Sequence, residues 1–180
     1  MIHDLETPSP WVRRWAALIP RGAVLDLACG RGRHARHLAS LGHEVLAVDR
    51  DRDALAALAG VPGVQTLCAD LEAAAWPLPG RRFAGIVVCN YLHRPLLPRL
   101  ADSLEAGGVL IYETFAAGNE RYGRPSNPDF LLRPGELLEA FGALTVVAFE
   151  QGQLAVPKPA VVQRICAARA GAATLAIDNA

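Results

Sequence analysis

Two glycines and an aspartate stand close together at the end of the first apolar run, in the sequence VLDLACGRGR. Asp26 lies four residues before Gly30, and Gly32 follows. Glycine lets a backbone turn tightly and approach a ligand, and the N–H groups that open the next helix are free to bind it. An acid beside such a turn suits a ligand with an ammonium group and a sulfonium cation, whereas it repels a pyrophosphate.

The same turn also fits a different ligand. Gly30, Gly32 and Ala35 satisfy the G-x-G-x-x-A pattern of dinucleotide-binding proteins. An NAD(P)-binding oxidoreductase is therefore an alternative, although the sequence contains no Tyr-x-x-x-Lys pair and no added segment that would hold a hydride acceptor.

Two further acids follow the next two apolar runs. Asp49 ends the second run, where its carboxylate can accept hydrogen bonds from ribose hydroxyls in either class of protein. Asp70 follows the third run and can accept a hydrogen bond from an adenine amino group, with Leu71 supplying its backbone N–H. Both acids have a structural alternative, which is to cap the next helix. Asp26 also has a structural alternative, because a buried acid can fix the loop by accepting hydrogen bonds from backbone N–H groups.

Apolar periodicity predicts alternating strands and helices. The predicted strands are Ala23–Ala28, Glu44–Val48, Val64–Cys68, Phe83–Cys89, Val109–Phe115, Ala143–Glu150 and Ala160–Arg169. The predicted helices are Pro10–Ile19 with Ser9 as its N-cap, Arg33–Leu41, Asp51–Ala59 with Asp51 as its cap, Pro95–Leu104 and Pro134–Phe141. Gly107 and Gly108 are expected to end the fourth helix.

This alternation predicts an α/β fold: a doubly wound, mostly parallel, seven-stranded Rossmann-like sheet. The last two strands have no helix between them, so the segment 151–159 should form a hairpin and make one C-terminal strand antiparallel. We expect a single domain over residues 1–170 and a flexible tail over 171–180. Ligands of such sheets bind beyond the carboxyl ends of the strands, at the switch point in strand order.

The motifs resemble one family. VLDLACGRGRHARHLASLGHEVLAVDRD resembles motifs I and II of the class I S-adenosylmethionine (SAM)-dependent methyltransferases, CADLE resembles motif III, and IVVCNYL resembles motif IV. The resemblance covers Val24 to Phe115. The loop is most similar to that of the small tellurite-resistance-type bacterial enzymes, and NYLHRP and GNERYGRPSNPDF resemble a bacterial branch of unassigned substrate.

The resemblance implies a methyltransferase domain that binds SAM and releases S-adenosylhomocysteine. The glycine turn would hold the methionine part, Asp49 the ribose and Asp70 the adenine, while Asn90 would face the methionine moiety. The full set of expected cofactor-binding residues is Asp26, Ala28, Gly30, Gly32, Arg33, Asp49, Arg50, Asp70, Leu71 and Asn90. A non-catalytic SAM-binding module is a further alternative, since the chemistry needs no signature nucleophile.

Methyl transfer from a sulfonium is an in-line displacement, so a protein mainly aligns the acceptor. The expected acceptor-side residues follow the fourth and fifth strands. His93 is a candidate base or donor, or else a helix cap; Arg94 would pair with an anionic group or be solvated; and Glu113 would act as a base or pair with an arginine. Tyr122 completes this candidate catalytic set. The sequence after Cys89 is not Asn-Pro-Pro-Tyr, so nucleic-acid and protein-glutamine acceptors are unsupported.

The stretch Ala116–Arg133 is predicted to be an irregular loop of 18 residues. Loops this long are usually functional or disordered, and this one is a candidate lid. Its arginines favour carboxylate or phosphate recognition, so we expect a small polar or anionic acceptor; the alternative is a merely exposed, charged loop. A second basic cluster, which marks either a site or a solvated face, consists of Arg31, Arg33, His34, Arg36 and His37.

Bulk composition narrows the function classes. The 180 residues include 18 basic and 18 acidic side chains, a balance that argues against a nucleic-acid partner. The spacing of Cys29, Cys68, Cys89 and Cys166 predicts reduced, mostly buried thiols and no metal site. No apolar run approaches the roughly 18 residues that span a bilayer, and no signal peptide is evident. We therefore expect a cytoplasmic monomer or homodimer that acts on a small molecule.

Overall fold

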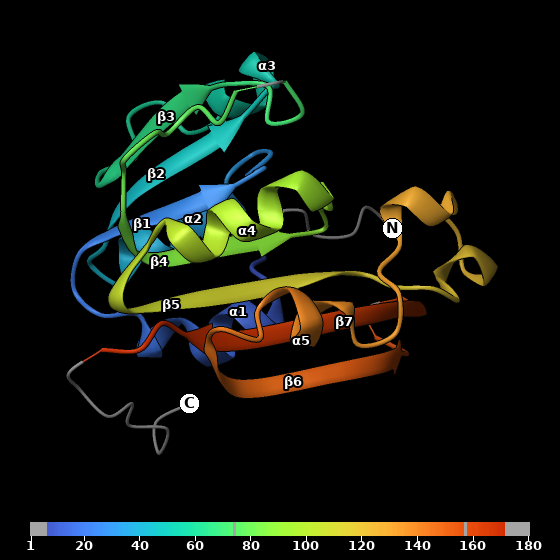
Figure 1. Ribbon diagram of the computed structural model, residues 1–180. Coiled ribbons are helices and arrows are strands. Elements are labelled where there is room, and N and C mark those ends of the chain that lie inside the picture. The colour runs from blue at the N-terminus through green and yellow to red at the C-terminus, as the bar shows by residue number, and fades with distance from the viewer. Residues whose placement is uncertain (1–6, 74, 157, 172–180) are drawn as a thin grey trace.

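Seven strands form a single sheet in the computed structural model, which describes residues 7–73, 75–156 and 158–171 (Figure 1). Their order is β3-β2-β1-β4-β5-β7-β6. The strands are β1 (Ala23–Leu27), β2 (Glu44–Asp49), β3 (Val64–Cys68), β4 (Phe83–Cys89), β5 (Leu104–Phe115), β6 (Thr145–Leu154) and β7 (Ala160–Ala168). The first five strands are parallel, and β7 runs antiparallel to both β5 and β6. The predicted sheet and its antiparallel C-terminal strand are confirmed.

Helices cover both faces of the sheet (Figure 1). The α-helices are α1 (Pro10–Trp15), α2 (Arg33–Ser40), α3 (Arg52–Ala56), α4 (Leu97–Asp102) and α5 (Glu136–Ala140). The 3₁₀ turns are η1 (Ala16–Leu18), η2 (Arg94–Leu96), η3 (Asn119–Arg121) and η4 (Pro128–Phe130). One apolar cluster joins the sheet to α1, α2 and α3, and a second joins it to α4 and α5.

The central strand β4 is buried along its whole length. It pairs with β1 on one side and with β5 on the other, and its side chains alternate between the two apolar clusters. A strand that is covered on both faces must be apolar throughout, which explains the run FAGIVVC. The carboxyl ends of β1, β4 and β5 are therefore fixed relative to one another.

Several element boundaries differ from the prediction. Gly107 and Gly108 do not end a helix but lie inside β5, which begins at Leu104 because Leu104 pairs with Phe83. The register shifts between Phe83 and Gly85, so the two glycines accommodate an irregularity that sequence periodicity does not reveal. The predicted strand 143–150 extends to Leu154, which shortens the hairpin loop.

The helices are shorter than predicted. α1 ends at Trp15 and continues as η1, and α3 covers only Arg52–Ala56 before the chain forms turns. Ser9 and Asp51 cap α1 and α3 as expected. The described residues contain no helix long and apolar enough to cross a membrane. The predicted tail lies outside the described residues except for Gly171.

Candidate functional site

The switch point in strand order lies between β1 and β4, which are neighbours in the sheet but lead to opposite faces. The residues that follow these strands, Ala28 and Asn90, have positive φ angles of 53° and 56°. This backbone conformation costs non-glycine residues energy and is enriched at functional sites. The Asn90 N–H donates to the Glu113 carbonyl at 2.9 Å, so the ends of β4 and β5 stay together.

The glycine turn after β1 is tied to the end of β2. The Gly30 N–H donates to Oδ2 of Asp49 at 2.7 Å, and the Cys29 N–H donates to the Val48 carbonyl at 3.0 Å. Gly30 has a φ of 53°, and a Cβ added there would meet no atom within 4 Å. The turn thus presents bare backbone to open space beside a carboxylate.

Asp26 lies beneath this turn with an exposed fraction of 1%. One hydrogen bond comes from the backbone of Ala35 in α2, which is the loop-fixing role considered above. Its Oδ2 atom is buried and has no hydrogen-bond partner among the described residues. Burial raises the pKa of Asp26 to about 7, and the nearby Asp49 adds to this effect. A buried acceptor without a donor is costly, and a cationic group at the turn would supply the missing interaction.

The acids at the end of β2 and after β3 also make local backbone contacts. Oδ1 of Asp49 accepts a hydrogen bond from the Asp51 N–H at 2.9 Å. The N-cap of α3 is Asp51 and not Asp49. The alternative in which Asp49 caps this helix is therefore wrong. Oδ1 of Asp70 accepts from the Glu72 N–H at 2.9 Å, so Asp70 does stabilise the turn that follows it. Asp70 is exposed and Leu71 is buried.

These residues fit SAM better than a dinucleotide. The buried, unpartnered oxygen of Asp26 and the carboxylate of Asp49 are suited to a cationic amino acid and to ribose hydroxyls. A pyrophosphate at the Gly30 turn would face both acids. Cys29 and Cys89 are buried in the same region, where burial raises both thiol pKa values; these thiols therefore remain protonated and behave as packing groups. Cys166 is likewise buried and Cys68 is exposed, so the thiols are mostly buried, as expected.

On the acceptor side, Glu113 is the buried acid at the end of β5. Its Oε2 accepts from Arg164 of β7 at 3.1 Å, which is the arginine pairing expected for it. Its Oε1 accepts from the Ser9 hydroxyl at 2.7 Å. Arg164 also pairs with Glu150 and lies over the ring of Trp11. The sequence offered Ser9 only as a helix cap and gave no signal for Arg164.

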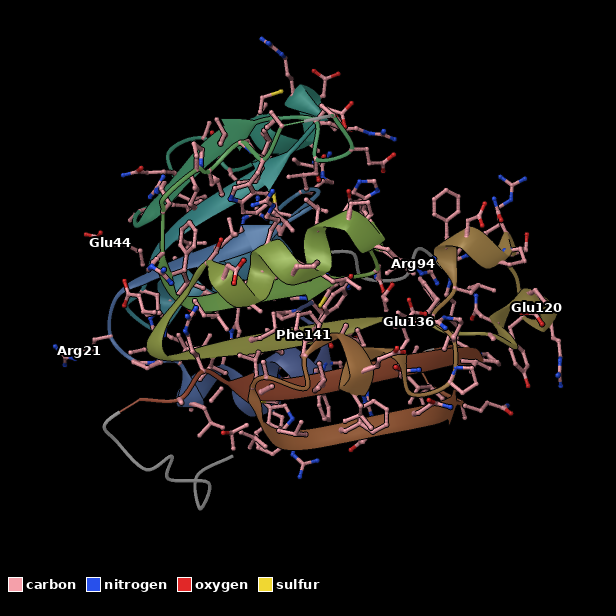
Figure 2. The ribbon with its side chains drawn as sticks, in the orientation of Figure 1. Arg21, Glu44, Arg94, Glu120, Glu136 and Phe141 are labelled. Atoms are coloured by element: carbon pink, nitrogen blue, oxygen red, sulfur yellow. The ribbon has the colours of Figure 1, made fainter. Side chains whose placement is uncertain are left out.

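Arg94 is partly exposed, but its guanidinium is not free for an acceptor. Its guanidinium donates to both carboxylate oxygens of Glu136 at 2.6 and 3.1 Å (Figure 2). It also donates to the carbonyl oxygens of Asp129 and Leu131. The hydrogen bond to Glu136 raises the pKa of Arg94. Burial opposes ionisation of Glu136, but its bonds to Arg94 and to the Arg133 backbone outweigh this cost and lower its pKa. The anionic partner of Arg94 is thus internal.

The remaining acceptor-side candidates are His93 and Tyr122. His93 is half-buried and stands at the N-cap position of η2, but its side chain makes no capping hydrogen bond, so the cap alternative is wrong. Tyr122 is 42% exposed, in the loop after β5. Arg33 donates to the Thr7 carbonyl at 3.4 Å, which places it at the rim of the glycine turn, beside the chain that leads to Ser9.

The loop 116–133 is more ordered than predicted, since it contains η3 and η4. Its base is closed by a bridge between Ala116 and Leu132. Asn119 is buried and joins the carbonyl of Pro125 to the N–H of Val161 in β7. The outer part of the loop borders an open hollow of about 450 Å³. That hollow is lined by Arg124, Pro125, Ser126, Asn127 and Phe130.

Part of the basic cluster on α2 makes structural contacts. His34 is buried and accepts from the Ser9 N–H at 3.2 Å, and burial lowers its pKa to about 3. Arg36 donates to the carbonyl oxygens of Arg31 and Ala57. His34 and Arg36 therefore hold α2 against neighbouring segments.

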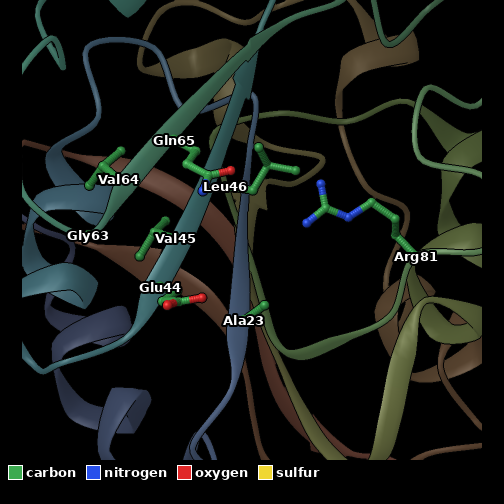
Figure 3. Close-up of a pocket in the computed structure, with 8 residues that line it drawn as sticks. All are labelled: Ala23, Glu44, Val45, Leu46, Gly63, Val64, Gln65 and Arg81. Atoms are coloured by element: carbon green, nitrogen blue, oxygen red, sulfur yellow. The ribbon is translucent and has the colours of Figure 1, made fainter.

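A second hollow lies at the opposite edge of the sheet (Figure 3). It has a volume of about 200 Å³ and borders the first residues of three strands, Ala23, Glu44 and Val64. The Arg81 side chain reaches over it from the chain that precedes β4 (Figure 3). Because ligands of open α/β sheets bind at the carboxyl edge, this hollow is not the candidate site.

Comparisons with known proteins agree with this geometry. Residues 24–108, a little under half of the chain, match the family model described as a methyltransferase domain. The comparison with curated proteins gives no significant match.

Three solved structures share the fold. TehB from Haemophilus influenzae has a TM-score of 0.76 and 19% identity over 90% of this chain; the chain spans 62% of TehB. A TehB-like SAM-dependent methyltransferase from Corynebacterium glutamicum has a TM-score of 0.62 and 22% identity. The match covers 88% of this chain and 86% of the Corynebacterium protein. The glycopeptide N-methyltransferase MtfA, crystallised with SAM, has a TM-score of 0.62 and 19% identity, with coverages of 88% and 92%.

The two TehB structures agree with the subgroup that the glycine loop resembles. At these identities the structures establish a common fold, while the family model identifies the domain that carries the glycine turn and the acids. Together, these comparisons show that residues 24–108 are similar to a methyltransferase domain and that the chain shares its fold with SAM-dependent methyltransferases.

Proposed function

We propose that the protein transfers the methyl group of SAM to a small polar or anionic acceptor and releases S-adenosylhomocysteine. The observation that carries this proposal is the meeting of the glycine turn with two carboxylates. Gly30 donates to Asp49, and the buried Oδ2 of Asp26 lacks a donor beside the same turn. This arrangement favours a ligand that is cationic at one end and carries ribose hydroxyls.

The cofactor contacts follow from the order of the strands. Asp26 and the turn with Gly30 and Gly32 would hold the charged methionine part, together with Ala28, Arg33 and Asn90. Asp49 and Arg50 would border the ribose, and Asp70 with the Leu71 N–H would bind the adenine edge. Asp49 can accept further hydrogen bonds because each carboxylate oxygen has two lone pairs and is used only once by the described backbone.

The protein's part in the reaction is alignment. Bound SAM supplies an electrophilic methyl group on a positively charged sulfur. Glu113 stands beside Asn90 at the end of β5, and Ser9 and Arg164 fix both of its carboxylate oxygens. Held in this way, Glu113 can orient an N–H or O–H of the acceptor through a remaining lone pair. His93, which precedes η2, is the candidate group to take a proton from the acceptor.

The class of acceptor rests on the loop after β5. Arg94 is occupied by Glu136, so anion recognition falls to Arg121 and Arg124, whose exposed side chains make no hydrogen bond or ion pair with the other described residues. Arg124 borders the open hollow of about 450 Å³. Arginine forms bidentate hydrogen bonds with carboxylates and phosphates. This arrangement supports a small acceptor with such a group.

The test combines binding with turnover. Calorimetric titration should show binding of SAM and S-adenosylhomocysteine and none of NADH. S-adenosylhomocysteine formation is then measured against small carboxylates, phosphates and amines, and the anionic compounds should give the turnover. Turnover restricted to cationic amines would contradict the acceptor class. Binding of NADH without SAM would contradict methyl transfer altogether, and SAM binding without turnover on any compound would favour a non-catalytic module.

A further inference from the structure

Ser9 lies in a short, stiff segment between two prolines, in the sequence TPSPW. A proline fixes its own φ and disfavours helical backbone in the residue before it. Ser9 accordingly has a φ of −52° and a ψ of 137°, which is close to the polyproline conformation. The segment 7–9 is therefore stiff before any tertiary contact forms, and its place on the molecule is set by its hydrogen bonds.

Ser9 uses every one of its polar groups, and two of the contacts reach distant elements. Its N–H donates to Nε2 of His34 in α2 at 3.2 Å. Its hydroxyl donates to Oε1 of Glu113 in β5 at 2.7 Å and accepts from the Trp11 N–H at 3.1 Å. Its carbonyl accepts from the Arg13 N–H within α1. Ser9 thus joins the first turn of α2 to the acid at the end of β5.

The three side chains of this connection are shielded from water. The exposed fractions of Ser9, His34 and Glu113 are 5%, 3% and 9%. His34 must be neutral to accept the Ser9 N–H, because an imidazolium carries a proton on both ring nitrogens. Burial lowers the pKa of His34 to about 3, so the ring is neutral at physiological pH. His34 therefore serves the Ser9 backbone as a fixed acceptor.

The two supports of the Glu113 carboxylate differ in kind. Arg164 donates to Oε2 at 3.1 Å, but the same guanidinium also pairs with Glu150. A cation that is divided between two carboxylates balances charge without fixing the direction of either one. The Ser9 hydroxyl is neutral and directional, and it belongs to a segment that is stiff and fastened at its N–H. The direction of the Glu113 carboxylate is therefore set mainly by Ser9.

We propose that His34 is a positioning residue of the methyl-transfer site. It holds the Ser9 backbone so that the Ser9 hydroxyl meets Oε1 of Glu113, and this directs the remaining lone pairs of Glu113 to the acceptor. The assignment rests on the proposed function, which places Glu113 on the acceptor side. Because α2 begins at the glycine turn, with Gly32 as its N-cap, His34 also fixes the acceptor side relative to the cofactor side.

The Glu113 carboxylate can report its own support. In protein labelled with ¹³C at the glutamate carboxyl carbons, its NMR signal is assigned from its loss in Glu113→Gln. His34→Leu keeps apolar volume but removes the acceptor, so it should shift and broaden the Glu113 signal as Ser9→Ala does. Hydrogen exchange at the Ser9 amide should become at least about 10-fold faster in His34→Leu.

Two further variants separate the hydrogen bond from packing. The side-chain oxygen of His34→Gln can accept the same Ser9 N–H, so this variant should restore both the Glu113 signal and the Ser9 exchange rate. Adding Ser9→Ala to His34→Leu should change the Glu113 signal little further, because both substitutions act on one contact. His37→Leu is the matched control, since His37 lies three residues further along α2 and its Nε2 has no hydrogen-bond partner among the described residues. It should leave both readings unchanged.

Turnover is measured as S-adenosylhomocysteine formation with the small carboxylate that gives the highest rate in the unaltered protein. His34→Leu should lower kcat by about 10- to 100-fold through misplacement of Glu113. It should change the Kd of SAM by less than about twofold, because His34 makes none of the contacts assigned to SAM. His34→Gln should recover most of the lost kcat.

An unchanged Glu113 signal in folded His34→Leu would overturn the assignment. A loss that His34→Gln does not restore would overturn it as well, because the loss would then come from packing around the ring. Absence of SAM binding or of turnover in the unaltered protein would instead contradict the proposed function. The Glu113 signal and the Ser9 exchange rate need no ligand, so they would still decide whether His34 positions Glu113.

Discussion

At the scale of single residues, the burial of Asp26 links ligand binding to pH. Its pKa rises from an ordinary 3.8 to about 7, mainly through burial. Between these values the folded protein holds a proton that the unfolded chain has lost, so the free energy of unfolding falls as pH rises through this range. A cationic ligand binds the ionised carboxylate more strongly than the protonated one, so binding favours loss of the Asp26 proton.

We therefore predict opposite pH trends for stability and for SAM affinity. The free energy of unfolding should fall by up to about 4 kcal/mol between pH 4 and 7 on account of Asp26. SAM affinity should rise between pH 6 and 8, with proton release detectable by calorimetry in buffers of different ionisation enthalpy. Asp26→Asn, which cannot ionise, should lose the proton release. A variant that still releases the same proton would show that another group is responsible.

Asp49 fixes the glycine turn and is also expected to bind the ligand. Asp49→Ala should weaken SAM binding by about 1–3 kcal/mol through lost charge-assisted hydrogen bonds. The loss includes the bond from Gly30 that shapes the turn, so Asp49→Asn, which keeps one acceptor oxygen, should lose less. Both affinities are measured by calorimetry. If Asp49→Ala binds SAM normally, the ribose has been placed wrongly.

At the scale of elements, the start of α2 depends on a glycine that packs as well as turns. Gly32 caps α2 with a φ of 76°, and a Cβ there would lie 2.4 to 2.6 Å from the side-chain carbons of Leu58. Leu58 follows α3 and is 1% exposed. The glycine turn is thus held between α2 and the chain after α3, which positions its N–H groups at the carboxyl edge of the sheet.

We predict that Gly32→Ala destabilises the fold by about 1–3 kcal/mol in chemical denaturation, because the new methyl group overpacks the site and alanine disfavours this φ. Adding Leu58→Ala should not restore full stability, since it leaves the backbone strain and creates a cavity. Gly30→Ala should destabilise less, because its position is open. Equal losses at both glycines would mean that Leu58 is not the cause.

The loop after β5 depends on the Arg94–Glu136 pair. Arg94→Met removes the bonds to the carbonyl oxygens of Asp129 and Leu131 and leaves the buried Glu136 without its main partner. We predict faster trypsin cleavage after Arg121 and faster amide exchange over residues 118–130, with SAM affinity changed less than twofold. Arg99→Met, on the exposed side of α4, is the control. Unchanged cleavage would show that Asn119 and the bridge at Ala116 hold the loop without Arg94.

At the scale of the whole molecule, binding at the switch point should stabilise the entire sheet. The residues assigned to SAM follow β1, β2, β3 and β4, which form one continuous hydrogen-bonded unit. A ligand that binds only the folded state stabilises it by about 2.7 kcal/mol at 100 times its dissociation constant.

For a chain of this size we predict a rise in melting temperature of about 5–10 °C with SAM or S-adenosylhomocysteine at that concentration. The same concentration of NADH should leave the melting temperature unchanged. The measurement is a thermal scan at constant pH, and a rise with NADH alone would argue for the dinucleotide alternative.

The sequence by itself determined the sheet and the edge of the sheet at which a cofactor is expected. Apolar runs specify strands because their side chains must be buried on one or both faces, and the order of runs and helices limits the topology. The glycine turn after β1 and the acids near the carboxyl ends of β1, β2 and β3 could be predicted for the same reason, because the carboxyl ends of parallel strands meet at one edge of the sheet. Their individual contacts with SAM remain predictions.

Only the tertiary structure decided which polar side chains pair with one another. Arg94 and Glu136 are 42 residues apart, and Glu113 meets Ser9 across 104 residues, so no local pattern announces either contact. The same applies to the Leu58 side chain that fills the space beside Gly32. Local periodicity indicates which face of an element is buried, but the partner across that face is set by packing between distant segments. The residues proposed to face the acceptor are held by such partners.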